Sequence, residues 1–242
     1  MKKDNIFVDA ISEMRPFVFD EQVAEVFEDM IQRSVPGYEM SLSMIALIAR
    51  LYARLETNVY DLGCSLGASS LALVSGNSLD GLRLVGVDNA EAMLLSCSKN
   101  LESANLQCEW DLICENITDT VIQNASIVVL NFTLQFIPLE RRLQLLEKIY
   151  SGLVSGGVVL ISEKIAFEEE GIQKSMTNLH EDFKRAHGYS DLEVSQKRTA
   201  LENVLIPESI TDHKSRLIKA GFSNCSRWFQ CFNFASLIAF KD

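Results

Sequence analysis

The chain has 242 residues, of which 48% are hydrophobic and 23% are charged, and its formal charge is −11 at pH 7. This composition suits a single domain over residues 1–242, and no apolar stretch approaches the roughly 18 residues of a membrane-spanning helix. The acidic balance argues against direct nucleic-acid binding, because proteins that hold a phosphate backbone usually present a basic face. We therefore expect a small-molecule ligand and, since no signal-peptide pattern is seen, a cytoplasmic location.

Two helices are expected before the first strand, in an N-terminal helical segment over residues 1–57. Residues 1–15 show no pattern and are expected to form a mobile arm. Apolar residues then recur at helical spacing from Phe19 to Ile31, the stretch SVPGYEM at 34–40 breaks this helix, and a second apolar stripe runs from Leu42 to Leu55.

Strands and helices alternate from residue 58 onward. Strand-like segments lie at 58–63, 82–88, 108–114, 126–132 and 157–164, and helical patterns lie at 69–75, 90–104 and 140–154. Short apolar runs separated by amphipathic helices predict parallel strands covered on both faces. Ligands of such α/β sheets bind beyond the carboxyl ends of the strands.

A polar, helix-prone segment at 166–200 interrupts the alternation. We expect it to be a helical insertion that serves as a lid or as a dimer contact. A helix at 208–220 follows and is stopped by Gly221, and the segments 225–231 and 235–241 are expected to pair as an antiparallel hairpin.

The stretch VYDLGCSLGASS at 59–70 predicts a tight bend at Gly63, Ser65 and Gly67. Such a bend lets a ligand approach the main chain and directs free N–H groups at it; alternatively, the glycines serve only the geometry of a strand–helix turn. Asp88 ends the next strand, where an acid accepts hydrogen bonds from both ribose hydroxyls. It could also cap the helix that begins at Ala90. The bend and the acid together favour a nucleoside site.

The sequence GCSLG departs from the dinucleotide fingerprint GxGxxG, because Ser65 stands at the second glycine. With Asp61 two residues before Gly63, it resembles instead the (D/E)xGxGxG motif of class I S-adenosylmethionine (SAM) enzymes. LVSGG at 153–157 resembles the L-x-P-G-G turn of the same superfamily. The resemblance covers about 55–165 and 205–242. It implies a Rossmann-like class I SAM-dependent methyltransferase fold: a mostly parallel seven-stranded sheet with a C-terminal antiparallel hairpin and N-terminal helices.

Longer stretches resemble the bacterial carboxy-S-adenosyl-L-methionine synthase family. They are RSVPGYEM (33–40), YDLGCSLGASS (60–70), LNFTLQFIP (130–138), QKRTALENVLIP (196–207) and WFQCFNFASLIAF (228–240). The resemblance implies an enzyme that converts SAM and prephenate to carboxy-SAM, phenylpyruvate and water. It also implies a homodimer, whose product passes to a separate tRNA carboxymethyltransferase that modifies the wobble uridine to 5-oxyacetic acid.

The resemblance also implies the site residues. Arg198 would be the catalytic residue and would bind the carboxylate of carboxy-SAM, reaching in from the neighbouring subunit; the alternative is an exposed arginine beside Lys197. The remaining residues implied to bind SAM are Tyr38, Gly63, Cys64, Ser65, Asp88, Asn89, Asn116, Ile117 and Asn131.

Within that set, Asp88 would bind the ribose, with Asn116 and Ile117 near the adenine. Tyr38, Gly63–Ser65 and Asn131 would face the methionine portion and the transferred carbon. Tyr38 could equally be a packing residue between two apolar helices. Asp61 is expected to orient the turn or to meet the methionine amino group, and Cys64 to contribute only backbone.

The cysteines and histidines predict no metal site. The six cysteines show no CxxC pair and no zinc-like spacing, and the three histidines form no HExxH motif. Two other functions remain open: a conventional SAM-dependent small-molecule methyltransferase, and a non-catalytic SAM-binding subunit.

Overall fold

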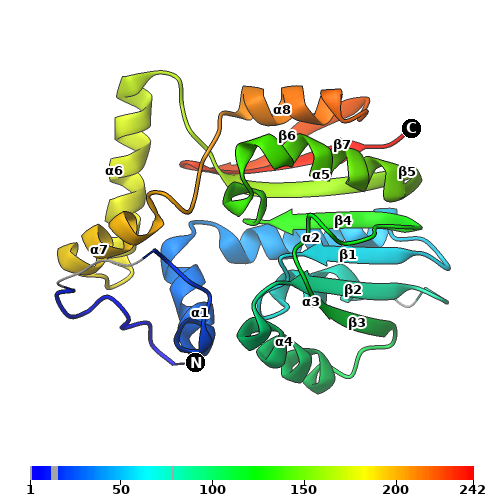
Figure 1. The fold of residues 1–242 in the computed structure, drawn as a ribbon, viewed down its shortest axis with the longest axis horizontal. Helices are drawn as coiled ribbons and strands as arrows, with labels where there is room; N and C mark the ends of the chain where they lie inside the picture. Colours follow the sequence, from blue (N-terminus) through cyan, green and yellow to red (C-terminus); the bar gives the residue numbers. More distant parts are fainter. Residues whose placement is uncertain (1, 12–15, 78) are drawn as a thin grey trace.

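The computed structural model describes residues 2–11, 16–77 and 79–242, and its centre is a seven-stranded sheet (Figure 1). The strands are β1 (Asn58–Leu62), β2 (Arg83–Asp88), β3 (Glu109–Cys114), β4 (Ala125–Asn131), β5 (Leu153–Lys164), β6 (Asn224–Cys231) and β7 (Phe234–Phe240). Their order is β3-β2-β1-β4-β5-β7-β6. Strands β1 to β5 are parallel to one another, and β7 is antiparallel to both β5 and β6. The predicted mostly parallel sheet with a C-terminal antiparallel hairpin is confirmed.

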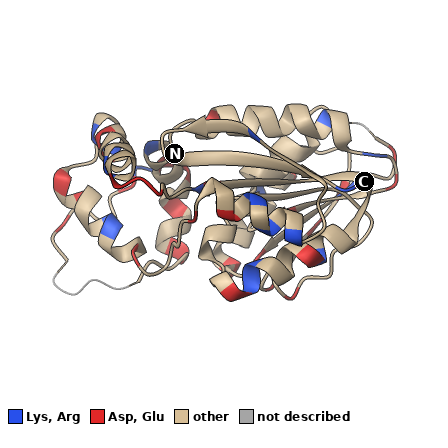
Figure 2. Cartoon of the chain, turned by 90° about the horizontal axis from the view of Figure 1, so that it is seen from above, with Lys and Arg blue, Asp and Glu red and all other residues tan. Residues whose placement is uncertain are grey.

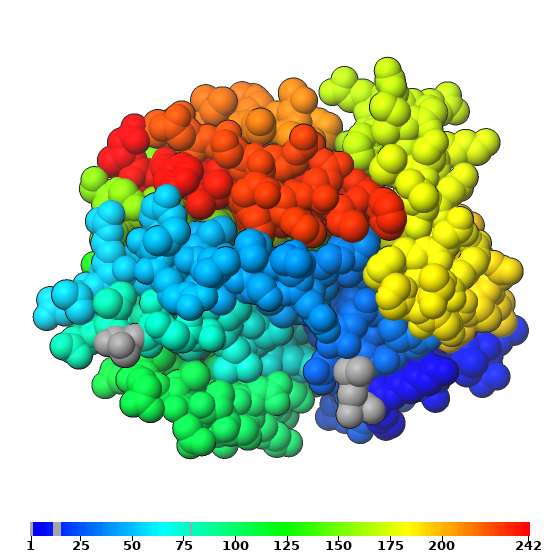
Figure 3. Space-filling view, turned by 180° about the vertical axis from the view of Figure 1, so that it is seen from behind, coloured from blue at the N-terminus to red at the C-terminus, as the bar shows by residue number. Residues whose placement is uncertain are grey.

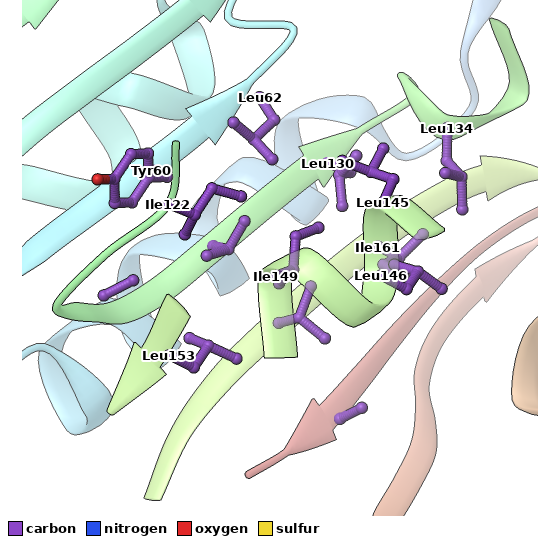
Figure 4. Packing of buried hydrophobic residues seen from close by; sticks show 14 of the residues in the cluster. Tyr60, Leu62, Ile122, Leu130, Leu134, Leu145, Leu146, Ile149, Leu153 and Ile161 are labelled. Carbon is purple, nitrogen blue, oxygen red and sulfur yellow. The ribbon is translucent and has the colours of Figure 1, made fainter. Parts of the chain in front are cut away.

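Helices cover both faces of the sheet, because the central strands are apolar on both sides. In β4, Val128 and Leu130 face one cluster of buried side chains, while Ile127 and Val129 face another. The first cluster lies under α5 (Leu139–Gly152) and α8 (Ile210–Lys219), as Figure 4 shows for α5. The second lies under α2 (Tyr38–Tyr52), α3 (Ala68–Val74) and α4 (Glu91–Ser103). With both faces covered by helices, the ends of the strands are left for a ligand.

The break between the first two helices is shorter than predicted. Helix α1 (Glu21–Ser34) begins after Asp20, whose side chain accepts from the Val23 N–H, and α2 begins at once after Gly37. Gly37 has φ +77°, and a Cβ there would lie 2.5 Å from Cζ of Phe229 in β6. Close packing of α2 against the hairpin therefore requires glycine, and Figure 3 shows these two parts side by side.

The predicted insertion at 166–200 is a pair of helices, α6 (Glu170–Ala186) and α7 (Asp191–Leu201). Ser190 and Glu193 form a capping box that starts α7, an arrangement that satisfies two backbone donors reciprocally. The pair stands beside α1, beyond the carboxyl ends of the parallel strands (Figure 1). A short 3₁₀ helix, η1 (Leu134–Phe136), follows β4 at the same edge.

The expectation of a mobile arm is wrong for residues 2–11, while residues 1 and 12–15 lie outside the described part. Asp4 is 1% exposed, and its N–H donates to Oδ2 of Asp29 at 2.7 Å. The Tyr189 hydroxyl donates to the Asp4 carboxylate. The Gln196 amide donates to the carbonyls of Phe7 and Asp9, each at 2.9 Å. These partners lie on or next to α1 and α7, so the arm ties those two helices together.

Candidate functional site

The candidate site is a cavity of about 1090 Å³ at the carboxyl edge of the sheet. It includes the point where the strand order reverses between β1 and β4, which is where sheets of this class bind ligands. Its volume lies just above the roughly 300–1,000 Å³ range of small-molecule pockets. All ten predicted site residues line it: Tyr38, Gly63, Cys64, Ser65, Asp88, Asn89, Asn116, Ile117, Asn131 and Arg198. The structure thus gathers residues from six parts of the chain at one place.

The bend after β1 is held by its own hydrogen bonds, contrary to the expectation of free N–H groups. The N–H groups of Gly63 and Cys64 both donate to the carbonyl of Val87, and the Ser65 N–H donates to Asp88. Gly63 has φ +82°, and a Cβ there would lie 2.4 Å from Cγ2 of Thr133. The glycine is therefore needed for backbone geometry and packing, and the bend shapes the cavity floor without presenting these donors to a ligand.

Asp88 is held rigidly at the end of β2. Its Oδ2 accepts from the Ser65 N–H and its Oδ1 from the Ala90 N–H, each at 2.9 Å. The residue therefore meets the start of α4 and also lines the cavity. Burial raises the pKa of its carboxyl group, and the backbone donors at Ala90 and Ser65 counteract that rise. Each oxygen retains a lone pair that can accept from a ligand hydroxyl.

Two amides extend the polar wall beside Asp88. Nδ2 of Asn89 donates to Oδ1 of Asn116 at 3.1 Å, which links the ends of β2 and β3. Ile117 follows with 5% exposure and provides an apolar surface at the same end. A polar edge next to an apolar face suits a purine base.

Asn131, the last residue of β4, carries an unsatisfied acceptor. Its Nδ2 donates to Oγ of Ser69 at 2.9 Å, while its buried Oδ1 has no partner among residues 2–11, 16–77 and 79–242. A buried amide oxygen without a donor is unfavourable, and an ammonium group in the cavity would satisfy it. The fit to the amino-acid portion of SAM rests on this atom.

Tyr38 lies in the first turn of α2 and lines the cavity, so it is not a pure packing residue. Its ring centroid is 6.3 Å from that of Phe132, which follows β4. Burial raises the pKa of its phenol above the usual value, so the hydroxyl remains a neutral hydrogen-bond donor.

Asp61 is fully buried and does not line the cavity. Oγ of Ser70 in α3 donates to its Oδ2 at 2.6 Å, and its Oδ1 has no partner within the described chain. Burial raises its pKa to about 7, the Ser70 hydrogen bond opposes that rise, and Asp88 adds to it. Asp61 was expected either to orient the turn or to meet the methionine amino group, and these contacts support the first role.

Asp61→Asn is expected to flatten the pH dependence of stability. The pKa of Asp61 is about 7 in the folded chain against the usual 3.8 of an aspartate, so between these values the folded chain binds a proton that the unfolded chain has released. The free energy of unfolding therefore falls by about 1.4 kcal/mol per pH unit in this window. Asparagine keeps the shape and carries no charge, so the variant should be more stable at about pH 8.

Urea unfolding at about pH 5 and about pH 8 measures this difference. Ser70→Ala, which removes the hydroxyl donor and keeps the carboxyl group, is the matched control and should retain the wild-type sign of the slope. Equal slopes for wild type and Asp61→Asn would contradict the proposed titration.

Cys64 has the properties of a small packing residue. Its side chain is 3% exposed, and contact with Cys97 together with burial raises the pKa of its thiol. The thiolate needed for nucleophilic attack is therefore disfavoured. Within the described chain, no group of three or more His, Cys, Asp or Glu residues is placed to hold a metal ion.

Arg198 lies on α7, and its side chain is 63% exposed. One guanidinium nitrogen donates to Oε1 of Glu181 in α6 at 2.8 Å. The remaining donors of this planar group can still bind a carboxylate. Arg198 lines the cavity of its own chain, whereas the resemblance implied a position in the neighbouring subunit's site.

Sequence reasoning missed the other basic residues of this wall. Lys164 ends β5, Lys184 lies on α6 and Lys197 lies on α7, and all three line the cavity. Lys184 and Lys197 occur in the polar segment 166–200, whose composition predicts solvent exposure. No local pattern signals that α6 and α7 fold back over the sheet edge.

The comparisons with known proteins agree with this architecture. A family model described as a methyltransferase domain matches residues 59–157. The carboxy-S-adenosyl-L-methionine synthase of Citrifermentans bemidjiense is 53% identical over 242 residues, covering 99% of each chain. That of Haemophilus ducreyi is 49% identical, covering 100% of this chain and 99% of its own.

A solved structure shows the same fold at low identity. Human N-acetylserotonin methyltransferase in complex with SAM superposes with a TM-score of 0.60 at 16% identity, covering 91% of this chain and 55% of its own. The curated relatives extend over α6, α7 and both flanks, which the methyltransferase-domain model does not reach.

Proposed function

Because this chain belongs to the carboxy-S-adenosyl-L-methionine synthase family, we propose that it converts SAM and prephenate to carboxy-SAM, phenylpyruvate and water. One observation carries the proposal: a single cavity joins Asp88, suited to a ribose, with Arg198, suited to a carboxylate. SAM has no group at its methyl carbon that would need a guanidinium partner. Carboxy-SAM has a carboxylate there, and guanidinium pairs with carboxylate through two parallel hydrogen bonds.

The proposed reaction is balanced without an added oxidant or base. Prephenate loses carbon dioxide and hydroxide as its ring becomes aromatic. The hydroxide removes a proton from the sulfonium methyl group to give water, and the methyl carbon bonds to carbon dioxide. The positive sulfur favours the intermediate carbanion where water is excluded. The chain then has to orient two ligands and hold their anionic groups.

The residues would divide the work along the cavity. Asp88 would accept from the ribose hydroxyls, and Asn116 and Ile117 would contact the adenine. Asn131 would accept from the methionine ammonium group through its unsatisfied oxygen. Tyr38, which stays protonated, would donate near the transferred carbon.

The assembly and the downstream step are part of the proposal. We propose a cytoplasmic homodimer whose product passes to a separate tRNA carboxymethyltransferase. The exposure of Arg198 on α7 supports completion of the site by a second copy. Basic and acidic residues are interspersed along the chain (Figure 2). Because RNA binding usually needs a basic surface, this supports the proposal that a separate enzyme binds the tRNA. No helix in the described ranges is both long and apolar enough to cross a membrane.

Mass spectrometry tests the function directly. Purified protein incubated with SAM and prephenate should yield a SAM derivative heavier by one carbon dioxide, together with phenylpyruvate. Omission of prephenate is the matched control and should leave SAM unchanged. Transfer of an unmodified methyl group to a small molecule would instead indicate a conventional methyltransferase, and SAM that remains intact with prephenate would indicate a binding subunit.

A further inference from the structure

Three lysines, two of them buried and one half-buried, lie where the cavity meets β5, α6 and α7. Lys184 is 7% exposed and Lys197 is 5% exposed, and Lys164 is half-buried at the end of β5. All three line the same cavity as Arg198. Buried ammonium groups are unfavourable unless they are paired with an anion, so this concentration of positive charge requires an explanation.

The described partners do not neutralise this cluster. Within the part of the chain that is described, Lys164 and Lys184 make no salt bridge, and the nearby carboxylate of Glu181 is already bonded to Arg198 and Arg185. Lys197 has Asp4 at 3.5 Å. Within the described residues, salt bridges therefore place two carboxylates, those of Asp4 and Glu181, on the three lysines and Arg198. His180 adds no charge to the cluster, because burial holds its pKa far below the usual value.

The wall next to these lysines is aromatic. Phe132 and Phe234 pack edge to face with centroids 5.9 Å apart, and both line the cavity. The ring of His180 lies 4.8 Å from that of Phe234. Its Nε2 is 2.8 Å from the carbonyl oxygen of Ser34, so this nitrogen donates and the ring is held as a neutral surface. A flat or partly unsaturated ring would pack against these faces.

The part of the cavity at Lys164 (the basic end) lies far enough from the part at Asp88 (the nucleoside end) to hold a second ligand. Asp88 ends β2 and Lys164 ends β5, and these strands are three steps apart in the sheet order. At about 4.8 Å per step, the two strand ends lie roughly 14 Å apart. A ribose bound at Asp88 therefore leaves the lysines for a different molecule.

We propose that this end of the cavity binds a ring-bearing dicarboxylate, with Lys164 and Lys184 as its ammonium partners and Phe132 and Phe234 as the surface for its ring. The inference deepens the proposed function, on which it rests, by assigning residues to the co-substrate. Arg198 serves the transferred carboxylate, and the two lysines hold the dianion that supplies it.

Binding of such a dianion is coupled to proton uptake. Burial lowers the pKa of Lys184 to about 7, so at about pH 8 most of this side chain is neutral before the ligand binds. A carboxylate favours the ammonium form, so binding takes up a proton and affinity falls as the pH rises above about 7. The charged or titratable groups that face Lys184 are Lys164 from β5, His180 and Glu181 from α6, and Lys197 and Arg198 from α7.

Calorimetry of the full chain, saturated with S-adenosylhomocysteine, tests the proposal. This nucleoside lacks the methyl group, so prephenate binds without turnover. Lys184→Met and Lys164→Met are each expected to weaken prephenate binding at least about tenfold, the size of a lost charged hydrogen bond. Lys174→Met, on an exposed position of α6 outside the cavity, should change it by less than about twofold. S-adenosylhomocysteine affinity should stay within about twofold throughout.

A second readout isolates Lys184 from a structural role. Titrations at about pH 8 in two buffers of different ionisation enthalpy should show proton uptake in the wild type and less in Lys184→Met. Lys184→Gln, which keeps a polar group, should show the same loss if the methionine variant folds poorly. Prephenate affinity equal to that of the wild type in both lysine variants, or no prephenate binding by the wild type, would overturn the proposal.

The two proposals fail separately. If carboxy-SAM never forms but prephenate binding still depends on Lys184, the dicarboxylate site stands and the proposed function falls. If carboxy-SAM forms at wild-type rate and prephenate KM in both lysine variants, the proposed function stands and the site is wrong.

Discussion

Arg198→Ala is expected to lower carboxy-SAM formation by about 10²- to 10³-fold while SAM binding persists. The guanidinium is proposed to pair with the new carboxylate, whose charge is present only as the product forms, and loss of one such donor typically removes about 3–4 kcal/mol of transition-state stabilisation. The fold should remain intact, because the side chain is 63% exposed and its partner Glu181 retains Arg185. Initial rates by mass spectrometry, with SAM affinity by calorimetry, measure both effects.

Arg185→Ala is the matched control. Arg185 also pairs with Glu181, at 3.4 Å, but it does not line the cavity, so its loss should leave the rate within about twofold. Arg198→Lys should be intermediate, since lysine keeps the charge and loses the two parallel hydrogen bonds. Wild-type rates in Arg198→Ala would remove this residue from the mechanism.

Mixed dimers identify the subunit that supplies the guanidinium. Arg198→Ala and Asp88→Ala subunits, each inactive alone, should regain about one quarter of the wild-type rate after co-refolding if Arg198 acts across the interface. Half of the randomly formed dimers are then mixed, and each has one complete cavity. No recovery would place Arg198 in its own chain's site.

Asp88→Ala is expected to weaken SAM binding at least about 100-fold. The substitution removes the acceptors for both ribose hydroxyls, and hydrogen bonds to a charged group contribute about 1.5–3 kcal/mol each. It also removes the acceptor of the Ser65 and Ala90 N–H groups, so the bend and the start of α4 lose their common anchor. Calorimetric titration with S-adenosylhomocysteine measures the affinity, and thermal unfolding reports the structural part.

Glu115→Ala provides the comparison for Asp88. Glu115 directly follows β3, its N–H donates to the Asp88 carbonyl at 3.1 Å, and its side chain does not line the cavity. The affinity of the Glu115→Ala variant for S-adenosylhomocysteine should equal that of the wild type. A similar loss in both variants would mean that the carboxylate of Asp88 does not contact the nucleoside.

The strands and the nucleoside end of the cavity could be predicted because their signals are local. Parallel strands buried on both faces are continuous apolar runs, as in β4, and their carboxyl ends necessarily meet at one edge. The strand order of the resembled superfamily places the ends of β1 and β2 side by side, so Asp88 and the bend at Gly63 were expected to lie close together. The helix boundary at Gly37 was missed by a few residues, because a left-handed glycine can start a helix without a spacer.

The contacts that could not be predicted join residues far apart in sequence. Nothing near Asp4 indicates that its carboxylate meets Tyr189, 185 positions away. The sequence around Lys184 and Lys197 is polar, which predicts exposed side chains. Both are buried only because α6 and α7 fold over the carboxyl ends of the strands. The N–H groups of the bend were expected to be free, since their acceptor, the Val87 carbonyl, belongs to another strand.

The anchoring of Asp4 also sets an order of events on the ribosome. The hydrogen bond between Asp4 and Tyr189 cannot form before Tyr189 has been translated. At about 5–20 residues per second, translation of the 185-residue interval takes roughly 10–40 s. The nucleoside half of the sheet, completed by β4, can emerge during that delay. The nascent chain is therefore expected to acquire its nucleoside pocket before the helix bearing Arg198 is clamped in place.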